Sequence, residues 1–376
     1  MNQTDLLHAA LAQEGAYLDT LQGLVRLESP TPDKVAADRL ADHLQALLAE
    51  DWAIERLAQA EAGDQLVARQ NAPGDTSTLL LCHYDTVWPL GTLERMPLRR
   101  DGDKYYGPGI LDMKAGIATA LHAARLAREA GGLRGPLTLL LSSDEETGSR
   151  VSRDLIEELA RQHDRVLVLE PGRDDGALKT GRKGVGDFHI RFEGKSAHAG
   201  NNPKEGASAL RELAHFLLYA EDLASDEAAT SVNLTTAKGG SAGNVIAEEA
   251  IAGLDVRVLQ SSEAERVEES FRCYAPRDPR VKVTVGGGLN RPPMEPNAAN
   301  RALAAEARQL AGKMGLTLEE AVVGGGSDGN FTSALGVPTL DGLGAVGEGP
   351  HARHEHIRVR ETLERLALVA ALLARS

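Results

Sequence analysis

Three short apolar runs constrain the fold of this chain most strongly, because each is followed closely by side chains of the kind that bind metals. The runs are LLLC before His83, LTLLL shortly before Glu145 and Glu146, and RVLVL before Glu170. Runs of this length and composition are typical of strands buried on both faces of a parallel sheet. Ligands bind beyond the carboxyl ends of such strands. We therefore expect these polar side chains to gather at one edge of the sheet.

Two further segments add metal-type ligands. Asp112 lies in the turn GPGILDMKAG, and histidines occur in GPHARHEH near the C-terminus. Two histidines with three carboxylate positions, counting the Glu145–Glu146 pair as one, suit zinc, with cobalt or manganese as alternatives. Carboxylates at this density would repel one another strongly without cations between them. A single residue of this kind is equally compatible with a strand-end or capping role, but five positions in series predict a metal site.

The neighbours of these residues indicate how such a site would work. His83 and Asp85 form an H-x-D sequence. Alternate residues of a strand point the same way, so Asp85 can fix the tautomer of a metal-bound imidazole. The short carboxylate of Asp112 can bridge two ions with its two oxygens. Glu145 and Glu146 are adjacent, so their side chains diverge. One can bind a metal while the other removes a proton from an attacking water.

Composition limits the function classes. With 41 Lys and Arg against 55 Asp and Glu, the formal charge of −14 argues against nucleic acid or an anionic membrane as a partner. The two cysteines, Cys82 and Cys273, are too far apart in the chain to indicate a disulfide scaffold. The first 27 residues resemble an acidic amphipathic helix and not an export signal, and no apolar stretch is long enough to span a bilayer. The expected location is the cytoplasm.

The order of the expected elements gives the fold class and the domains. A chain of 376 residues favours two domains. Alternating strands and helices predict an α/β domain whose mostly parallel sheet is covered by helices on both faces. From about residue 183 the order strand–helix–strand–strand–helix–strand predicts an inserted two-layer α+β domain. We expect the metal-binding domain in residues 1–182 and 291–376, and the insert in 183–290, between glycine-rich hinges. The elements expected in the first domain include a helix over 4–27, strands over 77–83, 137–142 and 165–170, and strands over 318–323 and 337–341.

Nine motifs occur in one order over nearly the whole chain: HYDTV, GPGILDMKAG, SSDEETGS, LEPG, GKSAHAG, GGSAGNVI, LDVRV, GGGSDGNF and GPHARHEHI. In these motifs the chain resembles the M20 metallopeptidases, and its flanking residues resemble the glutamate carboxypeptidase branch most. The resemblance implies two zinc ions per subunit and a cis peptide bond at Asp112–Met113. It assigns His83 and Glu170 to one ion, Glu146 and a C-terminal histidine to the other, Asp112 to the bridge, Glu145 to the general base, and Asp85 to the orientation of His83.

The C-terminal ligand has more than one candidate. In the family this histidine is followed a few positions later by a glutamate. His351 with Glu355 fits the commonest spacing, so His351 is the expected ligand. His354 is the alternative, and His356 is a third histidine in the same segment.

The resemblance also implies roles for the insert. It would mediate dimerisation, and His198 in GKSAHAG would reach the partner's active site to polarise the scissile carbonyl. Asn244 in AGNVI and Arg257 in LDVRV match contacts to the substrate carboxylate, which a guanidinium can bind through two hydrogen bonds. Arg291 and the glycine loop GGGSDG are weaker candidates for the same role. Without the resemblance, His198 and Arg257 would be read as surface residues.

These expectations combine into one predicted function. The chain would be a homodimeric, dinuclear zinc hydrolase that cleaves an amide bond next to a free carboxylate, most simply as a carboxypeptidase. The alternative is a deacylase of N-acyl amino acids, so the substrate would be a small peptide or an N-acyl amino acid. A binding protein without catalysis would not need Glu145. A nucleotide-dependent oxidoreductase would leave the ligands unexplained, and no G-x-G-x-x-G motif is present.

Overall fold

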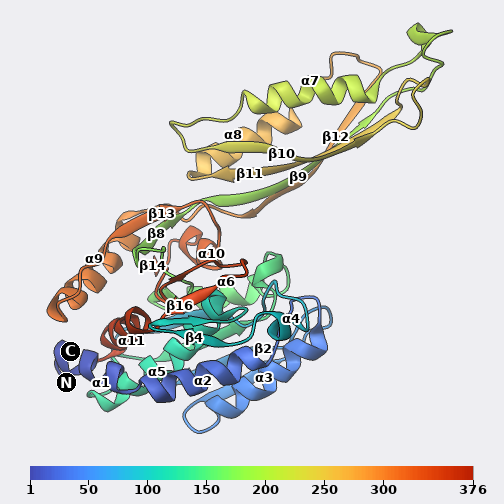
Figure 1. The fold of residues 1–376 in the computed structure, drawn as a ribbon. Helices are drawn as coiled ribbons and strands as arrows, with labels where there is room; N and C mark the ends of the chain where they lie inside the picture. The colour runs from blue at the N-terminus through green and yellow to red at the C-terminus, as the bar shows by residue number, and fades with distance from the viewer. Residues whose placement is uncertain (376) are drawn as a thin grey trace. The chain divides into compact units, whose positions relative to one another are not determined.

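The structure, a computed structural model, describes residues 1–375, which divide into two compact units (Figure 1). Unit 1 comprises Met1–Thr180, Pro296–Val322 and the described residues from Ser327 onward. Unit 2 comprises Gly181–Glu295 and Val323–Gly326. The chain therefore leaves unit 1, forms unit 2 and returns. No helix among the described residues is long and apolar enough to cross a membrane.

Unit 1 is built on a six-stranded sheet. Its strands in sheet order are β1 (Ala53–Leu57), β2 (Gln65–Gln70), β6 (Leu137–Ser142), β3 (Thr78–His83), β7 (Arg165–Val168) and β14 (Thr339–Leu340). The neighbours from β6 to β14 are parallel, whereas β2 is antiparallel to both β6 and β1. The register places His83 at the end of β3 opposite Ser142 at the end of β6. The residues that follow these two strands therefore emerge at the same edge of the sheet.

Both faces of this sheet are covered. Consecutive strand residues point to opposite sides of a sheet, and on β3 both sets are buried. Leu80 and Cys82 pack in the larger core cluster. Leu79 and Leu81 pack on the other face, where Ile156 of the flanking helix α6 (Arg153–Arg161) belongs to the same cluster. Figure 1 shows α1 (Gln3–Ala12), α2 (Glu14–Arg26), α3 (Lys34–Leu48) and α5 (Ala115–Glu129) on one side of the sheet, and α6 and α10 (Gly329–Ala334) on the other. This arrangement confirms the predicted α/β class.

The helices of unit 1 are α1 (Gln3–Ala12), α2 (Glu14–Arg26), α3 (Lys34–Leu48), α4 (Thr92–Arg95), α5 (Ala115–Glu129), α6 (Arg153–Arg161), α9 (Ala298–Lys313), α10 (Gly329–Ala334) and α11 (Val359–Leu373). Local sequence explains where several begin. Asp33 caps α3 by accepting a hydrogen bond from the Ala36 amide at 3.0 Å, which satisfies one of the free N–H groups of the first turn. Gly116 lets α5 approach the sheet closely, since a Cβ there would lie 2.0 Å from the carbonyl oxygen of Leu169. This contact brings the start of α5 next to the end of β7.

A small antiparallel sheet lies beside the main one in unit 1. Its strands in order are β15 (Gly347–Glu348), β16 (His356–Arg358), β5 (Lys104–Tyr106) and β4 (Arg99–Asp101). The pairing of β16 with β5 is antiparallel, with His356 opposite Tyr106. Their rings lie 4.9 Å apart. The small sheet thereby brings the C-terminal histidine segment next to the segment that leads into Asp112.

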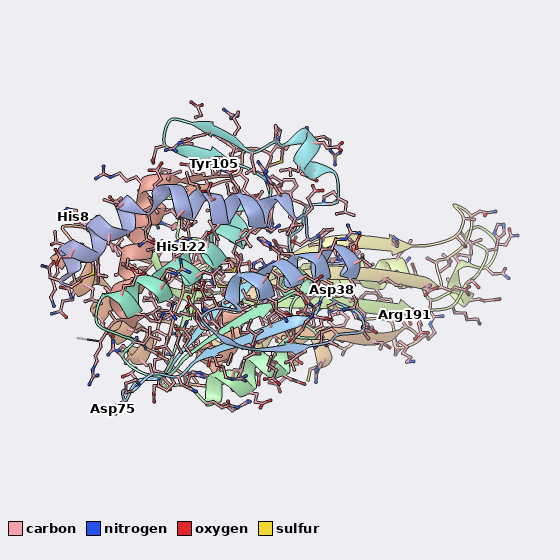
Figure 2. All side chains as sticks on the ribbon, turned by 90° about the horizontal axis from the view of Figure 1, so that it is seen from below. His8, Asp38, Asp75, Tyr105, His122 and Arg191 are labelled. Atoms are coloured by element: carbon pink, nitrogen blue, oxygen red, sulfur yellow. The ribbon has the colours of Figure 1, made fainter. Side chains whose placement is uncertain are left out.

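Unit 2 has the predicted element order. Its elements are β9 (Gly184–Glu193), α7 (Ala209–Glu221), β10 (Ser231–Gly239), β11 (Glu249–Val258), α8 (Ser261–Arg272) and β12 (Lys282–Arg291). The sheet order is β10-β11-β9-β12, and all pairs are antiparallel. On β9, Phe188, Ile190 and Phe192 are buried in the core of this unit. The alternate residue Arg191, labelled in Figure 2, is exposed.

Three local expectations differ from the structure. The segment 4–27, expected to be one helix, forms the two helices α1 and α2. The break is at Gln13, whose amide donates to the carbonyl oxygen three residues back, that of Ala10, at 3.1 Å. The strand expected over 318–323 is β13 (Glu320–Val323), which pairs with β8 (Leu178–Arg182) in a separate two-stranded sheet and does not join the main one. The edge strand β1 and its neighbour β2 have no counterpart in the sequence-based prediction.

Candidate metal centre

His83 lies at the centre of a buried group of charged side chains in unit 1. Its Nδ1 atom is 3.1 Å from the carbonyl oxygen of Asp85 and 3.3 Å from the carboxylate of the same residue. These acceptors favour the tautomer with the proton on Nδ1. The Nε2 atom lies 3.3 Å from both Asp112 Oδ1 and Glu170 Oε1. It is nevertheless buried without a hydrogen-bond partner among the described residues.

Asp112 lies between two histidines. One of its carboxylate oxygens is 3.3 Å from His83 Nε2, and the other is 3.3 Å from His351 Nε2. Asp112 is in the segment Ile110–Lys114, just before α5. The Asp112–Met113 peptide bond is cis, as the family resemblance predicted. Asp112 can therefore present one oxygen to each of two ligand groups.

His351 completes the second group. Its Nε2 atom is 3.2 Å from Glu146 Oε2. The residue adopts φ 61°, in the left-handed region that non-glycine residues rarely occupy and that the surrounding structure must enforce. His354 belongs to neither group among the described residues, and its ring lies against Gly349, where an added Cβ would be 2.8 Å away.

The two groups have the composition of a dinuclear site. His83, Asp112 and Glu170 form one triad, and Asp112, Glu146 and His351 form the other, with the ligand atoms of each within 4.8 Å of one another. The unpartnered Nε2 of His83 and an unpartnered buried oxygen of Glu146 are atoms with lone pairs available for a cation. Imidazole and carboxylate donors suit zinc and neighbouring divalent metals. The residues therefore fit a pair of metal ions, with Asp112 common to both groups.

The electrostatics of the centre favour positive charge. Hydrogen bonds to Asp112 and Glu146 raise the pKa of His351 to about 10. Burial opposes protonation of His83, but its interactions with Asp112, Asp85 and Glu170 outweigh this effect and raise its pKa. Burial also raises the pKa of Glu146. Cations held between these groups would offset the mutual repulsion of the carboxylates.

Asp85 connects His83 to the Glu145–Glu146 pair. The two glutamates begin a short 3-10 turn, Glu145–Thr147, and their backbone amides each donate to one oxygen of Asp85 at 3.2 Å. Thr31 donates to the same carboxylate at 2.7 Å. Asp85 is fully buried. It therefore fixes the position of the turn that carries Glu145 as well as the ring of His83, which is more than the H-x-D motif indicated.

Glu355 is a further residue of the centre that the sequence marked only by its spacing from His351. Its Oε1 accepts hydrogen bonds from the backbone amides of Leu111 at 2.9 Å and Asp112 at 3.2 Å. Its Oε2 accepts from the Gly109 amide at 3.0 Å and from the Trp88 indole at 2.8 Å. Burial raises the pKa of Glu355 to about 7, although these four donors favour the ionised form. Glu355 thus ties the histidine segment to the turn that carries Asp112.

The remaining predicted site residues lie in unit 2. His198 Nδ1 accepts hydrogen bonds from the amides of Gly200 at 3.1 Å and Asn201 at 3.0 Å. In the neutral ring the proton is therefore on Nε2, which can act as a donor. The Ala199 amide donates to the Asn244 carbonyl oxygen at 2.9 Å, so the loops that carry His198 and Asn244 are held together.

The two arginines differ in their surroundings. Arg257 is on β11 and donates three hydrogen bonds to Asp255, from Nε to Oδ1 at 2.9 Å and to Oδ2 at 3.1 Å, and from Nη2 to Oδ2 at 2.8 Å. Arg291 ends β12 and is buried. It packs against the glycine loop, because a Cβ on Gly326 would lie 2.9 Å from Arg291 Cδ.

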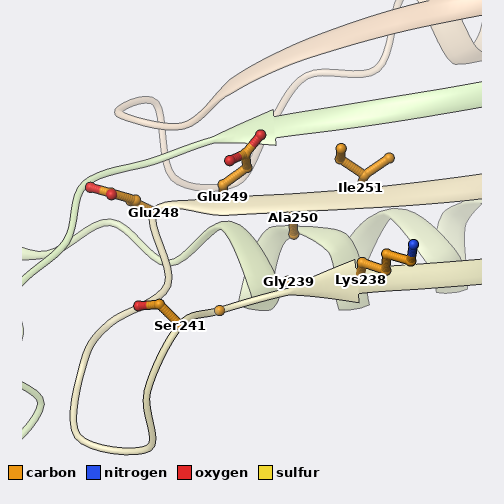
Figure 3. Close-up of a pocket in the computed structure, with 8 residues that line it drawn as sticks. Lys238, Gly239, Ser241, Glu248, Glu249, Ala250 and Ile251 are labelled. Carbon is orange, nitrogen blue, oxygen red and sulfur yellow. The ribbon is translucent and has the colours of Figure 1, made fainter.

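A hollow of about 290 Å³ lies beside the β10–β11 hairpin (Figure 3). Lys238, Ser241 and Glu248 are among its lining residues. The loop between these two strands carries Asn244, but Asn244 does not line the hollow. This hollow therefore contains none of the predicted site residues.

Comparison with known proteins supplies the family. The profile of the peptidase family M20/M25/M40 matches residues 79–375. Carboxypeptidase G2 from Pseudomonas sp. (strain RS-16) is 32% identical, over 98% of this chain and 91% of that protein. Succinyl-diaminopimelate desuccinylase from Xanthomonas oryzae pv. oryzae is 28% identical, over 95% of this chain and 98% of that protein. The crystal structure of aminopeptidase PepT from Bacillus cereus superimposes with a TM-score of 0.79 at 21% identity, covering 96% of this chain and 98% of that one. The chain belongs to peptidase family M20/M25/M40 and is a metal-dependent hydrolase.

Proposed function

We propose that this protein is a dinuclear zinc-dependent carboxypeptidase of the glutamate carboxypeptidase type, which hydrolyses an amide bond next to a free carboxylate. The observation that carries the proposal is the pair of triads that share Asp112. The likeness to carboxypeptidase G2 over nearly the whole of both chains supports the choice of reaction.

Each triad would hold one zinc ion. His83 and Glu170 would hold the first ion, Glu146 and His351 would hold the second, and Asp112 would be shared between them. When bound, the two ions would polarise the scissile carbonyl and lower the pKa of an attacking water. Asp85 and Glu355 hold the ligands in position through the hydrogen bonds described above.

Glu145 is the proposed general base. It is next to the ligand Glu146, and both backbone amides are fixed by Asp85. The Glu145 carboxylate takes a proton from the attacking water and then delivers it to the leaving nitrogen of the amide. The fixed turn limits the motion that this transfer requires.

Residues of unit 2 would bind the substrate. The Nε2–H of His198 can donate to the oxyanion that develops on the scissile carbonyl. Asn244, Arg257 and Arg291 are the candidates for the substrate carboxylate. Because Arg257 already donates three hydrogen bonds to Asp255, a substrate carboxylate competes with Asp255 for this guanidinium.

A homodimer formed through unit 2 would cover surface that this unit leaves open. β10 is an edge strand, with residues from Asn233 to Gly239 exposed. Unpaired strand edges are prone to pair with a second chain. Large apolar side chains are also exposed near this edge and on α7, with 61% exposure at Leu218, 43% at Leu234 and 42% at Leu210. These surfaces support the proposed dimerisation role.

A deacylase of N-acyl amino acids is the second candidate function. The likeness to a succinyl-diaminopimelate desuccinylase covers nearly the whole of both chains at 28% identity. Both activities need the same two ions and the same base. They differ in the group on the acyl side of the scissile bond.

Matched substrates test the proposal. The zinc-loaded enzyme would be assayed on N-acyl dipeptides ending in glutamate, on their C-terminal carboxamides and on simple N-acyl glutamates. Loss of charge-assisted hydrogen bonds of about 1.5–3 kcal/mol should lower kcat/KM for the carboxamides by about 10–150-fold. Equal turnover of acid and carboxamide would exclude a carboxylate-directed carboxypeptidase. A preference for simple N-acyl amino acids over acyl dipeptides would favour the deacylase. Metal analysis of the active protein checks for two zinc ions per subunit.

A further inference from the structure

A second hollow, of about 210 Å³, lies in the helical layer of unit 1. It is lined by residues of α2 and α5, by Leu47 near the end of α3, and by Asp51 and Trp52 before β1. Figure 2 shows His122, one of the lining residues, on α5. None of the metal-type ligands lines it. Arg125 is ten residues along α5, about 15 Å from its start beside the metal centre. The hollow is therefore separate from the centre.

Arg125 gives the hollow an excess of positive charge. Its guanidinium lies 3.8 Å from Asp51, but Arg128 already binds the same carboxylate at 2.5 Å. The hydrogen bond from Arg128 lowers the pKa of Asp51, so this carboxyl stays ionised. Two guanidinium groups thus share one carboxylate. The Arg125 guanidinium makes no hydrogen bond to any described residue, although it has five N–H donors.

Trp52 adds a hydrogen-bond donor and an aromatic wall. The residue as a whole is 9% exposed and lines the hollow. Its indole nitrogen is not among the buried side-chain atoms that lack a partner in the described part of the chain, so the N–H is accessible to a ligand. Leu47 and Leu121 supply apolar walls. The hollow therefore offers two unused donors next to apolar surface.

His122 and Thr20 complete the lining without adding charge. Thr20 Oγ1 donates to the Ala16 carbonyl oxygen at 3.1 Å and lies 3.0 Å from His122 Nε2. Burial, and the charge of Arg125, lower the pKa of His122 to about 4. At neutral pH this ring is uncharged. The single uncompensated charge of the hollow is therefore that of Arg125, which matches a monoanion.

We propose that this hollow binds a small monocarboxylate with an apolar body. The carboxylate accepts hydrogen bonds from Arg125 and from the Trp52 indole, and the body packs against Leu47, Leu121 and the Trp52 ring. A guanidinium suits this task because it binds a carboxylate through parallel hydrogen bonds. The volume is below the roughly 300–1,000 Å³ of drug-sized pockets, which limits the ligand to a single ring or a short branched chain.

Tryptophan fluorescence tests this site directly, because the chain contains only two tryptophans, Trp52 and Trp88. The metal-loaded full chain would be titrated with cyclohexanecarboxylate at constant ionic strength. We expect a saturable change that persists in Trp88→Phe and disappears in Trp52→Phe. A signal that comes from Trp88 alone would place the ligand at the metal centre, where Trp88 contacts Glu355, and would overturn the proposal.

Variants and matched ligands test the chemistry. Calorimetric titration of Arg125→Met should show binding weakened at least tenfold, with Arg125→Lys intermediate. Arg125 is about half exposed, so neither substitution should prevent folding. Cyclohexanecarboxamide should bind at least tenfold more weakly than the acid, and sulfate should not compete at equal concentration. Unchanged binding to Arg125→Met, equal binding of the carboxamide, or absence of heat with the wild-type chain would each overturn the proposal. None of these results would affect the function proposed for the metal centre.

Discussion

Replacing Glu355 by glutamine removes one of the two oxygens that hold the Asp112 turn to the histidine segment. Each oxygen of the wild-type carboxylate accepts two hydrogen bonds. Oε1 binds the amides of Leu111 and Asp112, and Oε2 binds the Gly109 amide and the Trp88 indole. A glutamine keeps one oxygen and places its NH₂ group against the other two donors. Whichever way the amide is oriented, two donors lose their acceptor.

The expected loss of stability follows from these contacts. Each buried donor left without an acceptor costs about 1–3 kcal/mol, so Glu355→Gln should lower the free energy of unfolding by about 2–6 kcal/mol. This is a large fraction of the roughly 5–15 kcal/mol typical of folded proteins. Trp88→Phe removes only one donor and leaves the carboxylate intact. Its expected loss through this hydrogen bond is smaller, about 0.5–1.5 kcal/mol.

Urea unfolding of the metal-free protein, followed by circular dichroism, measures these differences. Metal content after dialysis against a weak chelator gives a second readout. Asp112 belongs to both triads, and Glu355 holds the turn that carries Asp112 in position. We expect Glu355→Gln to retain fewer metal ions than the wild type. Glu361→Gln is the matched control, since that carboxylate is 42% exposed and pairs with Arg358 on the surface. Its effect should be within about 0.5 kcal/mol.

The result that would refute this reasoning is specific. If Glu355→Gln unfolds within about 0.5 kcal/mol of the wild type and keeps its full metal content, the four hydrogen bonds do not hold the Asp112 turn. A loss of stability with unchanged metal content would limit Glu355 to the fold and remove it from the metal centre.

Three further predictions concern the chemistry. Glu145→Gln should keep its metal but lose about 10²–10⁴-fold in kcat, measured on metal-loaded protein, and near-normal turnover would remove Glu145 as the base. His351→Ala should lose one metal ion and its activity, whereas His354→Ala should change metal content little, and elemental analysis of both variants would show the opposite pattern if His354 were the ligand. If His198 acts in the partner's site, mixing inactive His198→Ala with inactive Glu145→Gln should restore part of the activity, and no recovery despite proven subunit exchange would contradict the assignment.

The positions of the candidate strand-end ligands were predictable because the apolar runs indicate where the strands lie and where they end. The strand expected over 77–83 is Thr78–His83, and the one expected over 137–142 is Leu137–Ser142. Once these strands are parallel, the residues after them must emerge at one edge. The C-terminal histidine of the second triad was harder to predict, because His351, His354 and His356 are close together in the sequence. The geometry that brings His351 to Asp112 includes a left-handed backbone that no local pattern indicated.

Other parts could not be predicted for physical reasons. The strands β1 (AIERL) and β2 (QLVARQ) contain charged or polar residues at several positions. They therefore lack the apolar runs that identify the central strands. Their pairing with each other and with β6 depends on contacts distant in sequence. The positioning role of Glu355 is not visible in the sequence, because most of its partners are backbone amides. Backbone amides carry no sequence signal, so only the folded path of the Asp112 turn reveals them.

The register between β3 and β6 explains why Asp85 can serve two segments at once. His83 pairs with Ser142, so two residues beyond His83 and three residues beyond Ser142 the chain reaches Asp85 and Glu145 at the same edge. The Asp85 carboxylate there accepts the amides that begin the Glu145 turn while it faces the His83 ring. A one-residue slip would reverse the side-chain faces of β3 relative to β6. The same shift would separate Asp85 from those amides. The alternation that buries Leu80 on one face and Leu81 on the other therefore also places the candidate ligand His83 and the proposed base Glu145 at the same edge of the sheet.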